Sequence, residues 1–241
     1  MNSGFDAASS RPAACVRAVV VVTLAIPFFA LAIDARPTSR PSGVAIAQRA
    51  EEMSGPEARR ADFGAHNPSE DARFVADRVA QTQDNGNAEF IIIDKPLARM
   101  YVFDARAQLR GVTPVLLGAA YGDFSVPGVG SKPLSQIKLA ERTTPAGRFV
   151  AERGHDTGGA DVVWVDYDAA VSIHRVINSS PAQRRLQRLA TSTVADKRIS
   201  WGCINVPVNF YESFIRPIFA NQRAVVYVLP DSSPVREIFR F

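Results

Sequence analysis

Cysteine and histidine are scarce in this 241-residue chain, which has two cysteines, Cys15 and Cys203, and three histidines. The histidines lie too far apart to show a metal-ligand spacing, so the sequence predicts neither a metal nor another cofactor. Lysine and arginine form no dense run, and the net charge is only +4, so nucleic acid is not an expected partner. The hydrophobic share of 46% nevertheless predicts a folded domain rather than wholesale disorder.

A long hydrophobic run is also missing. The apolar stretch near the N-terminus, residues 18–33, is shorter than the roughly 20 residues that a membrane-spanning helix needs, and Pro27 interrupts it. Arg11 and Arg17 precede this stretch, and small-x-small cleavage patterns occur in it and after it. The pattern predicts a signal peptide over residues 1–32, or a short uncleaved anchor that would be the protein's only link to the membrane. In either case we expect the protein to be exported to the periplasm or cell envelope.

The two cysteines have different expected fates. Cys15 precedes the apolar stretch and would leave with the signal peptide, so the mature protein would hold one thiol with no disulfide partner. An unpaired thiol in an oxidising compartment is a liability unless the protein uses it or buries it. Cys203 is therefore a candidate nucleophile, and a buried, inert cysteine is the alternative. Gly202 would let another molecule's backbone approach the thiol because glycine has no Cβ.

Changes in composition divide the chain into segments. Residues 33–68 are rich in proline, alanine, arginine and serine, which predicts a flexible linker. A helical segment is predicted over residues 69–88, with Ser69 placed to cap it and apolar residues recurring at helical spacing. We expect residues 89–230 to form the main domain and residues 231–241 to form a C-terminal tail.

The main domain shows mostly strand patterns. Short apolar runs are separated by turn signals, and the first runs are joined by short polar loops that predict hairpins and an antiparallel sheet. Helical patterns occur at 180–190, where Ser180 is placed as a cap, and at 207–220. Many strands and few helices predict a mainly β domain with helices packed against the sheets. The expected strands cover residues 90–93, 100–103, 109–117, 161–165, 171–174 and 224–229.

Three segments carry a resemblance to a known family. Residues 91–103 contain IIIDK followed by RMYVF, residues 144–149 read TPAGRF, and His174 is followed by residues 200–205, SWGCIN. In this order they resemble the opening hairpin, the TPxGxF turn and the His…(S/T)HGCxN signature of the L,D-transpeptidase catalytic (YkuD-type) family of bacterial cell-wall enzymes. The resemblance runs from about residue 89 to residue 230.

This resemblance implies a β-sandwich-like mixed β domain that cross-links peptidoglycan. Cys203 would attack the carbonyl of a diaminopimelate residue in a tetrapeptide stem and expel the terminal D-alanine. The acyl group would then pass to an amine on a second stem, giving a 3→3 cross-link, so donor and acceptor stem peptides would be the partners. His174 would be the base, oriented by the backbone carbonyl of Arg175, and backbone N–H groups of Gly202 and Cys203 would hold the oxyanion.

The chain departs from the family pattern at two points. Trp201 stands where the family usually has histidine, and an indole can only donate a hydrogen bond, so it cannot relay a proton. The separation of His174 and Cys203 (203 − 174 = 29 residues) is also longer than usual by about one helix. We expect the additional residues, 179–197, to fold over the cleft as a lid or an acceptor-binding flap.

Further binding residues are expected around the cysteine. Ser200, Trp201 and Asn205 are candidates for oxyanion or substrate binding, with a turn-forming role as the alternative for the asparagine. The side chains of Arg148 and Arg175 could bind substrate carboxylates. Two other functions stay open at this point. One is an L,D-carboxypeptidase or other hydrolase of the same bond, and the other is a non-catalytic wall-binding module of the same fold.

Overall fold

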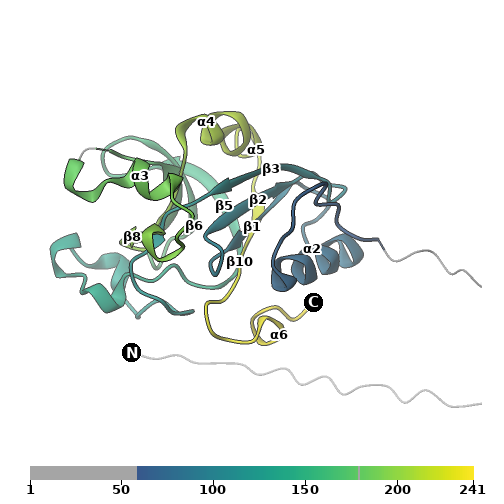
Figure 1. Ribbon diagram of the computed structural model, residues 1–241, viewed down its shortest axis with the longest axis horizontal. Helices are drawn as coiled ribbons and strands as arrows, with labels where there is room; N and C mark the ends of the chain where they lie inside the picture. The colour runs from purple at the N-terminus through teal and green to yellow at the C-terminus, as the bar shows by residue number, and fades with distance from the viewer. Residues whose placement is uncertain (1–58, 179) are drawn as a thin grey trace, which may run out of the picture. The chain divides into compact units, whose positions relative to one another are not determined.

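The computed structural model in Figure 1 describes residues 59–178 and 180–241. The predicted signal peptide and most of the predicted linker lie outside the described residues. Within the described part of the chain, no helix is both long enough and apolar enough to span a membrane.

Eight strands form one mixed sheet in the order β3-β2-β1-β10-β5-β6-β7-β9, and β4 and β8 form a separate pair. Neighbouring strands are antiparallel except in the pairs β1–β10, β7–β9 and β4–β8. The prediction of a mainly β domain that opens with hairpins is confirmed. The strands are β1 (Phe90–Asp94), β2 (Arg99–Phe103), β3 (Leu109–Pro114), β4 (Leu117–Gly118), β5 (Gly147–His155), β6 (Asp161–Asp166), β7 (Val171–Arg175), β8 (Arg198–Ser200), β9 (Ile204–Val206) and β10 (Ala224–Val228).

The long strand β5 connects the two halves of the large sheet. Residues 147–151 pair with β10, whereas residues 152–155 pair with β6. Apolar residues of β1, β2 and β10 share one core cluster with apolar residues of β6, β7 and β9, so the sheet folds over at β5. The arrangement is sandwich-like, but its two layers are one continuous sheet that shares a strand.

Strand β1 is buried on both faces, which is why its sequence is almost wholly apolar. Side chains alternate along a strand, so Phe90 and Ile92 lie on one face while Ile91 and Ile93 lie on the other. The first pair packs with helix α2 (Glu70–Thr82), and the second pair belongs to the core cluster between the two halves of the sheet. Figure 1 shows α2 on one side of these central strands and the helices α4 (Val208–Phe210) and α5 (Arg216–Ile218) on the other.

Helix α2 begins where the sequence predicts it. The Ser69 hydroxyl accepts a hydrogen bond from the Ala72 N–H at 3.1 Å and donates one to Asp94 at 2.6 Å. The cap therefore satisfies a free N–H of the helix and also ties its first turn to the end of β1.

Two predicted elements differ in the structure. The strand predicted for residues 109–117 ends at Pro114, which has no N–H for the sheet, and of the remainder only Leu117 belongs to a strand, β4. The helix predicted from Ser180 is a 3-10 turn (Pro181–Gln183) followed by the short α3 (Arg185–Ala190), and the Ser180 side chain makes no capping bond. The other helical elements are η1 (Val129–Ser131), η2 (Leu134–Gln136), η3 (Leu139–Glu141), η5 (Ala195–Lys197), α4 (Val208–Phe210), the π-helical turn η6 (Tyr211–Ile215), α5 (Arg216–Ile218) and α6 (Val235–Ile238).

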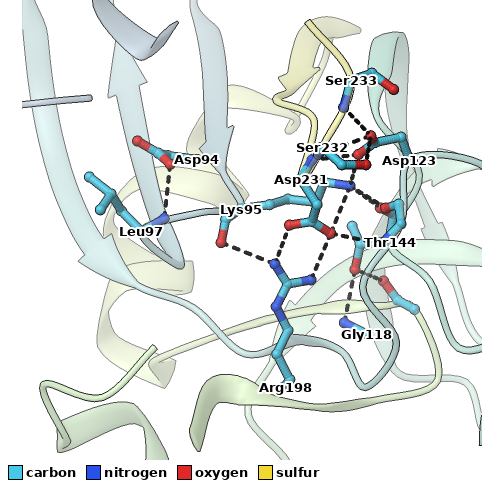
Figure 2. Close-up of polar contacts among 12 residues, drawn as sticks. Asp94, Lys95, Leu97, Gly118, Asp123, Thr144, Arg198, Asp231, Ser232 and Ser233 are labelled. Atoms are coloured by element: carbon cyan, nitrogen blue, oxygen red, sulfur yellow. Dashed lines mark hydrogen bonds and ion pairs between the residues drawn. The ribbon is translucent and has the colours of Figure 1, made fainter. Parts of the chain in front are cut away.

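A buried ionic network joins distant parts of the chain, as Figure 2 shows. The Lys95 ammonium, directly after β1, lies 3.1 Å from a carboxylate oxygen of Asp123 and 3.3 Å from one of Asp231. Arg198 on β8 forms a further ion pair with Asp231. All four side chains are almost inaccessible to solvent, so the two cations neutralise two carboxylates that would otherwise be costly to bury.

The same network fixes the backbone next to the candidate site. Lys95 donates hydrogen bonds to the carbonyls of Gly122 and Thr144, at 2.6 and 2.9 Å. Asp123 accepts the N–H of Ser233 at 2.8 Å and so ties down the segment after β10. Burial would raise the pKa of Asp123, but the backbone N–H groups and the Lys95 ammonium outweigh burial and hold this pKa well below its usual range.

Candidate active site

Cys203 and His174 meet because their strands are paired. β7 and β9 run parallel, His174 is opposite Asn205, and Cys203 lies directly before β9. Both side chains are half-buried and line one open pocket of about 360 Å³, to which Leu134 and Ile177 contribute apolar walls. Cys203 is therefore partly exposed at an open pocket rather than sealed in the core.

The His174 ring is oriented by contacts at both nitrogens. Nδ1 lies 2.7 Å from the backbone carbonyl of Arg175, and because a carbonyl only accepts, Nδ1 carries the proton. Nε2 is then the basic nitrogen, and it accepts a hydrogen bond from the Asn205 amide nitrogen at 3.1 Å. The Asn205 orientation follows from Arg185, whose guanidinium has only donors and contacts Oδ1. The arrangement assigns the tautomer that a general base for the thiol requires.

The sulfur has polar neighbours on strand β7 and at its start. Sγ lies 3.6 Å from the Ala170 carbonyl oxygen and 3.6 Å from the Ser172 hydroxyl. Nε2 of the neighbouring His174 accepts a hydrogen bond from the Asn205 amide nitrogen at 3.1 Å, and the interaction of the ring with the thiol shifts the pKa of both groups. The imidazole and the thiol are thus neighbours, and a transfer of the thiol proton to Nε2 would require Asn205 to release that nitrogen.

The electrostatics of the pair favour proton transfer from sulfur to imidazole. Burial would raise the pKa of the Cys203 thiol, but the interaction with His174 and the contact with Ser172 outweigh burial and lower it. Burial would lower the pKa of His174, but the interaction with Cys203 and the Arg175 carbonyl outweigh burial and raise it. Both shifts increase the share of the thiolate–imidazolium form at neutral pH.

The turn that carries Cys203 is held by its own side chains and by the preceding TPAGRF segment. Ser200 donates a hydrogen bond to the Cys203 carbonyl at 2.6 Å and accepts the Gly202 N–H at 3.1 Å. Thr144, fully buried, donates to the Gly202 carbonyl at 2.7 Å. Gly202 has φ +130°, and a Cβ there would lie 2.8 Å from the Thr143 carbonyl oxygen. Glycine is thus required by packing against Thr143, which corrects the expectation that it admits a substrate backbone.

The two backbone N–H groups expected to hold an oxyanion differ in whether they are free to donate a hydrogen bond. The Gly202 N–H already bonds to Ser200, so it is not free, which corrects that part of the expectation. The Cys203 N–H makes no hydrogen bond with any described residue, so it stays available beside the sulfur. The hydroxyl of Ser200 is likewise occupied by hydrogen bonds within the turn. Ser200 therefore contributes to the site by holding the loop in its conformation.

Trp201 lies at the pocket, whereas the side chain of Arg175 does not. Trp201 lines the pocket, with the Arg142 guanidinium 4.6 Å from its ring centroid. Arg175 directs its guanidinium to Asp161 and Glu212, so only its backbone carbonyl serves the site. Its side chain is committed to these partners and does not line the pocket that holds Cys203 and His174.

Arg148 and the remaining two histidines lie away from the pocket. Arg148 pairs with Asp84 at 2.6 Å and so ties β5 to the turn that follows α2. His66 and His155 are exposed in the described structure.

Sequence reasoning missed two polar residues of the site. Ser172 precedes His174 by two positions, and the two-residue period of a strand places both on the same face of β7, a signal that could have been used. Arg185 lies in the segment between the histidine and the cysteine, and no spacing rule marks it. Together with Cys203 and Asn205, these residues make a site capable of nucleophilic attack on a carbonyl, with a base and an adjacent backbone donor.

The geometry defines a mainly β domain with a cysteine–histidine pair in an open pocket. Comparison of structures finds similarity to the NMR structure of the catalytic domain from E. faecium L,D-transpeptidase, with 19% identity, a TM-score of 0.34, and coverage of 59% of this chain and 98% of that one. It also finds the L,D-transpeptidase LdtMt1 in complex with imipenem, with 17% identity, a TM-score of 0.34, and coverage of 59% of each chain. No protein-family model and no curated protein sequence matches this chain.

Proposed function

We propose that the protein is a cysteine-dependent L,D-transpeptidase that acts on peptidoglycan stem peptides in the periplasm or cell envelope. The observation that carries the proposal is the convergence of an accessible Cys203 and an oriented His174 in one pocket. The pKa shifts of the pair, downward for the thiol and upward for the imidazole, are those that an activated nucleophile needs. The three sequence segments that resemble the family point to the substrate.

The proposed reaction starts with transfer of the thiol proton to Nε2 of His174 after Asn205 has moved away. The sulfur attacks the diaminopimelate carbonyl of the donor stem, and the Cys203 N–H stabilises the oxyanion. The tetrahedral intermediate collapses to a thioester, and the D-alanine amine leaves with the proton from the imidazolium. An acceptor amine then attacks the thioester, gives its proton to Nε2 and releases the thiolate, so every proton and bond is accounted for.

The segment between the histidine and the cysteine takes part in the proposed binding site. Ile177, Ser180, Gln183 and Arg185 all come from this region and line the pocket. This placement supports the proposal that residues 179–197 act as an acceptor-binding flap or a lid, because the segment reaches the cleft that the peptides would enter. Deleting the segment while keeping the fold should change acceptor choice or turnover, and unchanged kinetics would refute the role.

The function is tested with purified disaccharide-tetrapeptides and separation of the products by mass. We expect the wild-type protein to release D-alanine and to form a 3→3 cross-linked dimer, and the Cys203→Ala variant to form none. Tripeptide without any dimer would identify a carboxypeptidase and overturn the transpeptidase assignment. No product from a correctly folded wild-type protein would favour a wall-binding module instead.

A further inference from the structure

The described lining of the pocket around Cys203 has one positively charged arginine and no carboxylate. Arg185 is the one permanently charged side chain among its described lining residues, and no aspartate or glutamate lines it. The nearby Arg142 directs its guanidinium to the Trp201 ring and to the Ile137 carbonyl and is not among those residues. An arginine that faces a pocket with no carboxylate is uncompensated there, so the pocket favours an anionic ligand.

The hydrogen bonds of Arg185 leave part of its guanidinium free. Nε donates to the Gln183 side chain at 2.6 Å, and Nη1 donates to Oδ1 of Asn205. Nη2 has no acceptor among the described residues. It is also not among the buried side-chain nitrogen and oxygen atoms that lack a partner, so it is exposed to solvent. Because Arg185 lines the pocket, this nitrogen is open to a ligand there. A guanidinium held at two nitrogens with the third open is preorganised to bind a carboxylate.

Arg185 is also connected to the imidazole of His174 through Asn205. It holds Oδ1 of Asn205, and the Asn205 amide nitrogen occupies Nε2 of His174, the position that must receive the thiol proton. A carboxylate bound at Nη2 would share the guanidinium with Asn205, weaken the bond from Nη1 to Oδ1 and so ease the release of Nε2. Binding of an anionic substrate and activation of the thiol are therefore connected through two hydrogen bonds.

We propose that Arg185 is the specificity-determining residue of the pocket, and that it selects acyl donors bearing a carboxylate close to the scissile carbonyl. The inference rests on the proposed function for the identity of the donor, but the recognition of a carboxylate beside Cys203 does not depend on it. Nη2, the free nitrogen of the guanidinium, is the group that contacts the substrate carboxylate. Asn205 connects this contact to His174 because it hydrogen-bonds both Arg185 and Nε2.

The test compares alkylation of Cys203 by iodoacetate, which carries a carboxylate, with alkylation by the neutral iodoacetamide. Both reagents lose iodide to the same thiolate, so the ratio of their rates cancels any change in the thiolate fraction. The full chain is used, and peptide mass spectrometry separates Cys203 from Cys15. We expect Arg185→Gln to lower the iodoacetate-to-iodoacetamide ratio by roughly tenfold or more, the size of one lost hydrogen bond to a charged group.

Matched variants show whether the effect belongs to this guanidinium. Arg184→Gln removes the same charge from the exposed neighbouring residue and should leave the ratio within about twofold of wild type, since exposed charges act weakly through solvent. Arg185→Lys keeps the charge and should retain most of the preference. An unchanged ratio in folded Arg185→Gln, or an equal loss in Arg184→Gln, would overturn the proposal.

A measurement on the wild-type protein keeps the proposal testable if Arg185→Gln does not fold. N-acetyl-D-alanine, which has a free carboxylate, should protect Cys203 from iodoacetamide, whereas N-acetyl-D-alaninamide at the same concentration should not. Equal protection by both, or protection by neither, would count against carboxylate recognition. Alkylation needs no turnover, so these results are independent of whether the chain cross-links stem peptides.

Discussion

Replacing Lys95 with methionine should destabilise the protein severely, because it removes one of two cations from a buried network. Lys95 makes ion pairs with Asp123 and Asp231 and donates hydrogen bonds to two carbonyls, and its side chain has no solvent exposure. Burial lowers the pKa of Lys95 while the two carboxylates act to raise it. Without the ammonium, Asp123 loses its cation and Asp231 keeps only Arg198, and removal of one partner from a buried pair costs about 3–5 kcal/mol.

Urea denaturation of Lys95→Met and wild type measures this loss, and a fall in melting temperature of roughly 6–20 °C should accompany it. Lys132→Met is the matched control, because Lys132 pairs with Glu141 at the surface and its loss should change stability little. A loss below about 1 kcal/mol for Lys95→Met, or one no larger than that of Lys132→Met, would refute the view that the network holds the fold together.

Three further predictions concern the site and its support. His174→Ala should move the midpoint of Cys203 alkylation by iodoacetamide to higher pH, because the lowered pKa of the thiol depends on the imidazole; an unchanged midpoint would contradict the pairing. Gly202→Ala should cost about 1–3 kcal/mol in thermal unfolding, since its Cβ would lie 2.8 Å from the Thr143 oxygen, and a neutral effect would show that the turn is looser than described. The folded-state pKa of Asp123 is depressed, so its contribution to stability is complete above about pH 4 and is lost as pH falls through that pKa. The stability difference between wild type and Asp123→Asn should therefore shrink in acid, and a difference constant down to low pH would disprove this.

Local patterns predicted those parts of the fold that local physics determines. Ser69 caps α2 because a hydroxyl before two acidic residues satisfies the first N–H groups of a helix, and this is visible in the sequence. The opening hairpin is likewise set by short apolar runs around tight turns. The helix predicted from Ser180 does not form as one unit. The 3-10 turn that begins at Pro181 ends at Arg184, and the left-handed backbone of Arg184 separates this turn from α3.

The cysteine–histidine pair of the candidate site could be nominated from the sequence, whereas its surroundings could not. His174 and Cys203 are rare residue types in recognisable segments, but they meet only because β7 and β9 pair in parallel. The roles of Thr144, Lys95 and Arg185 depend on contacts with residues that are distant in the sequence or lie in a segment without a pattern. No periodicity or capping rule reports such contacts, so they became apparent only in three dimensions.

The most direct test of the central claim is the intact mass of the protein after exposure to a carbapenem-type acylating agent. An acyl adduct requires the sulfur to attack a carbonyl, which simple alkylation does not. We predict one adduct on Cys203 in the wild type, none in Cys203→Ala, and formation slowed by about 10²–10⁴-fold in His174→Ala, the usual contribution of a general base. An absent adduct in the wild type, or an equally fast one without the imidazole, would contradict the account.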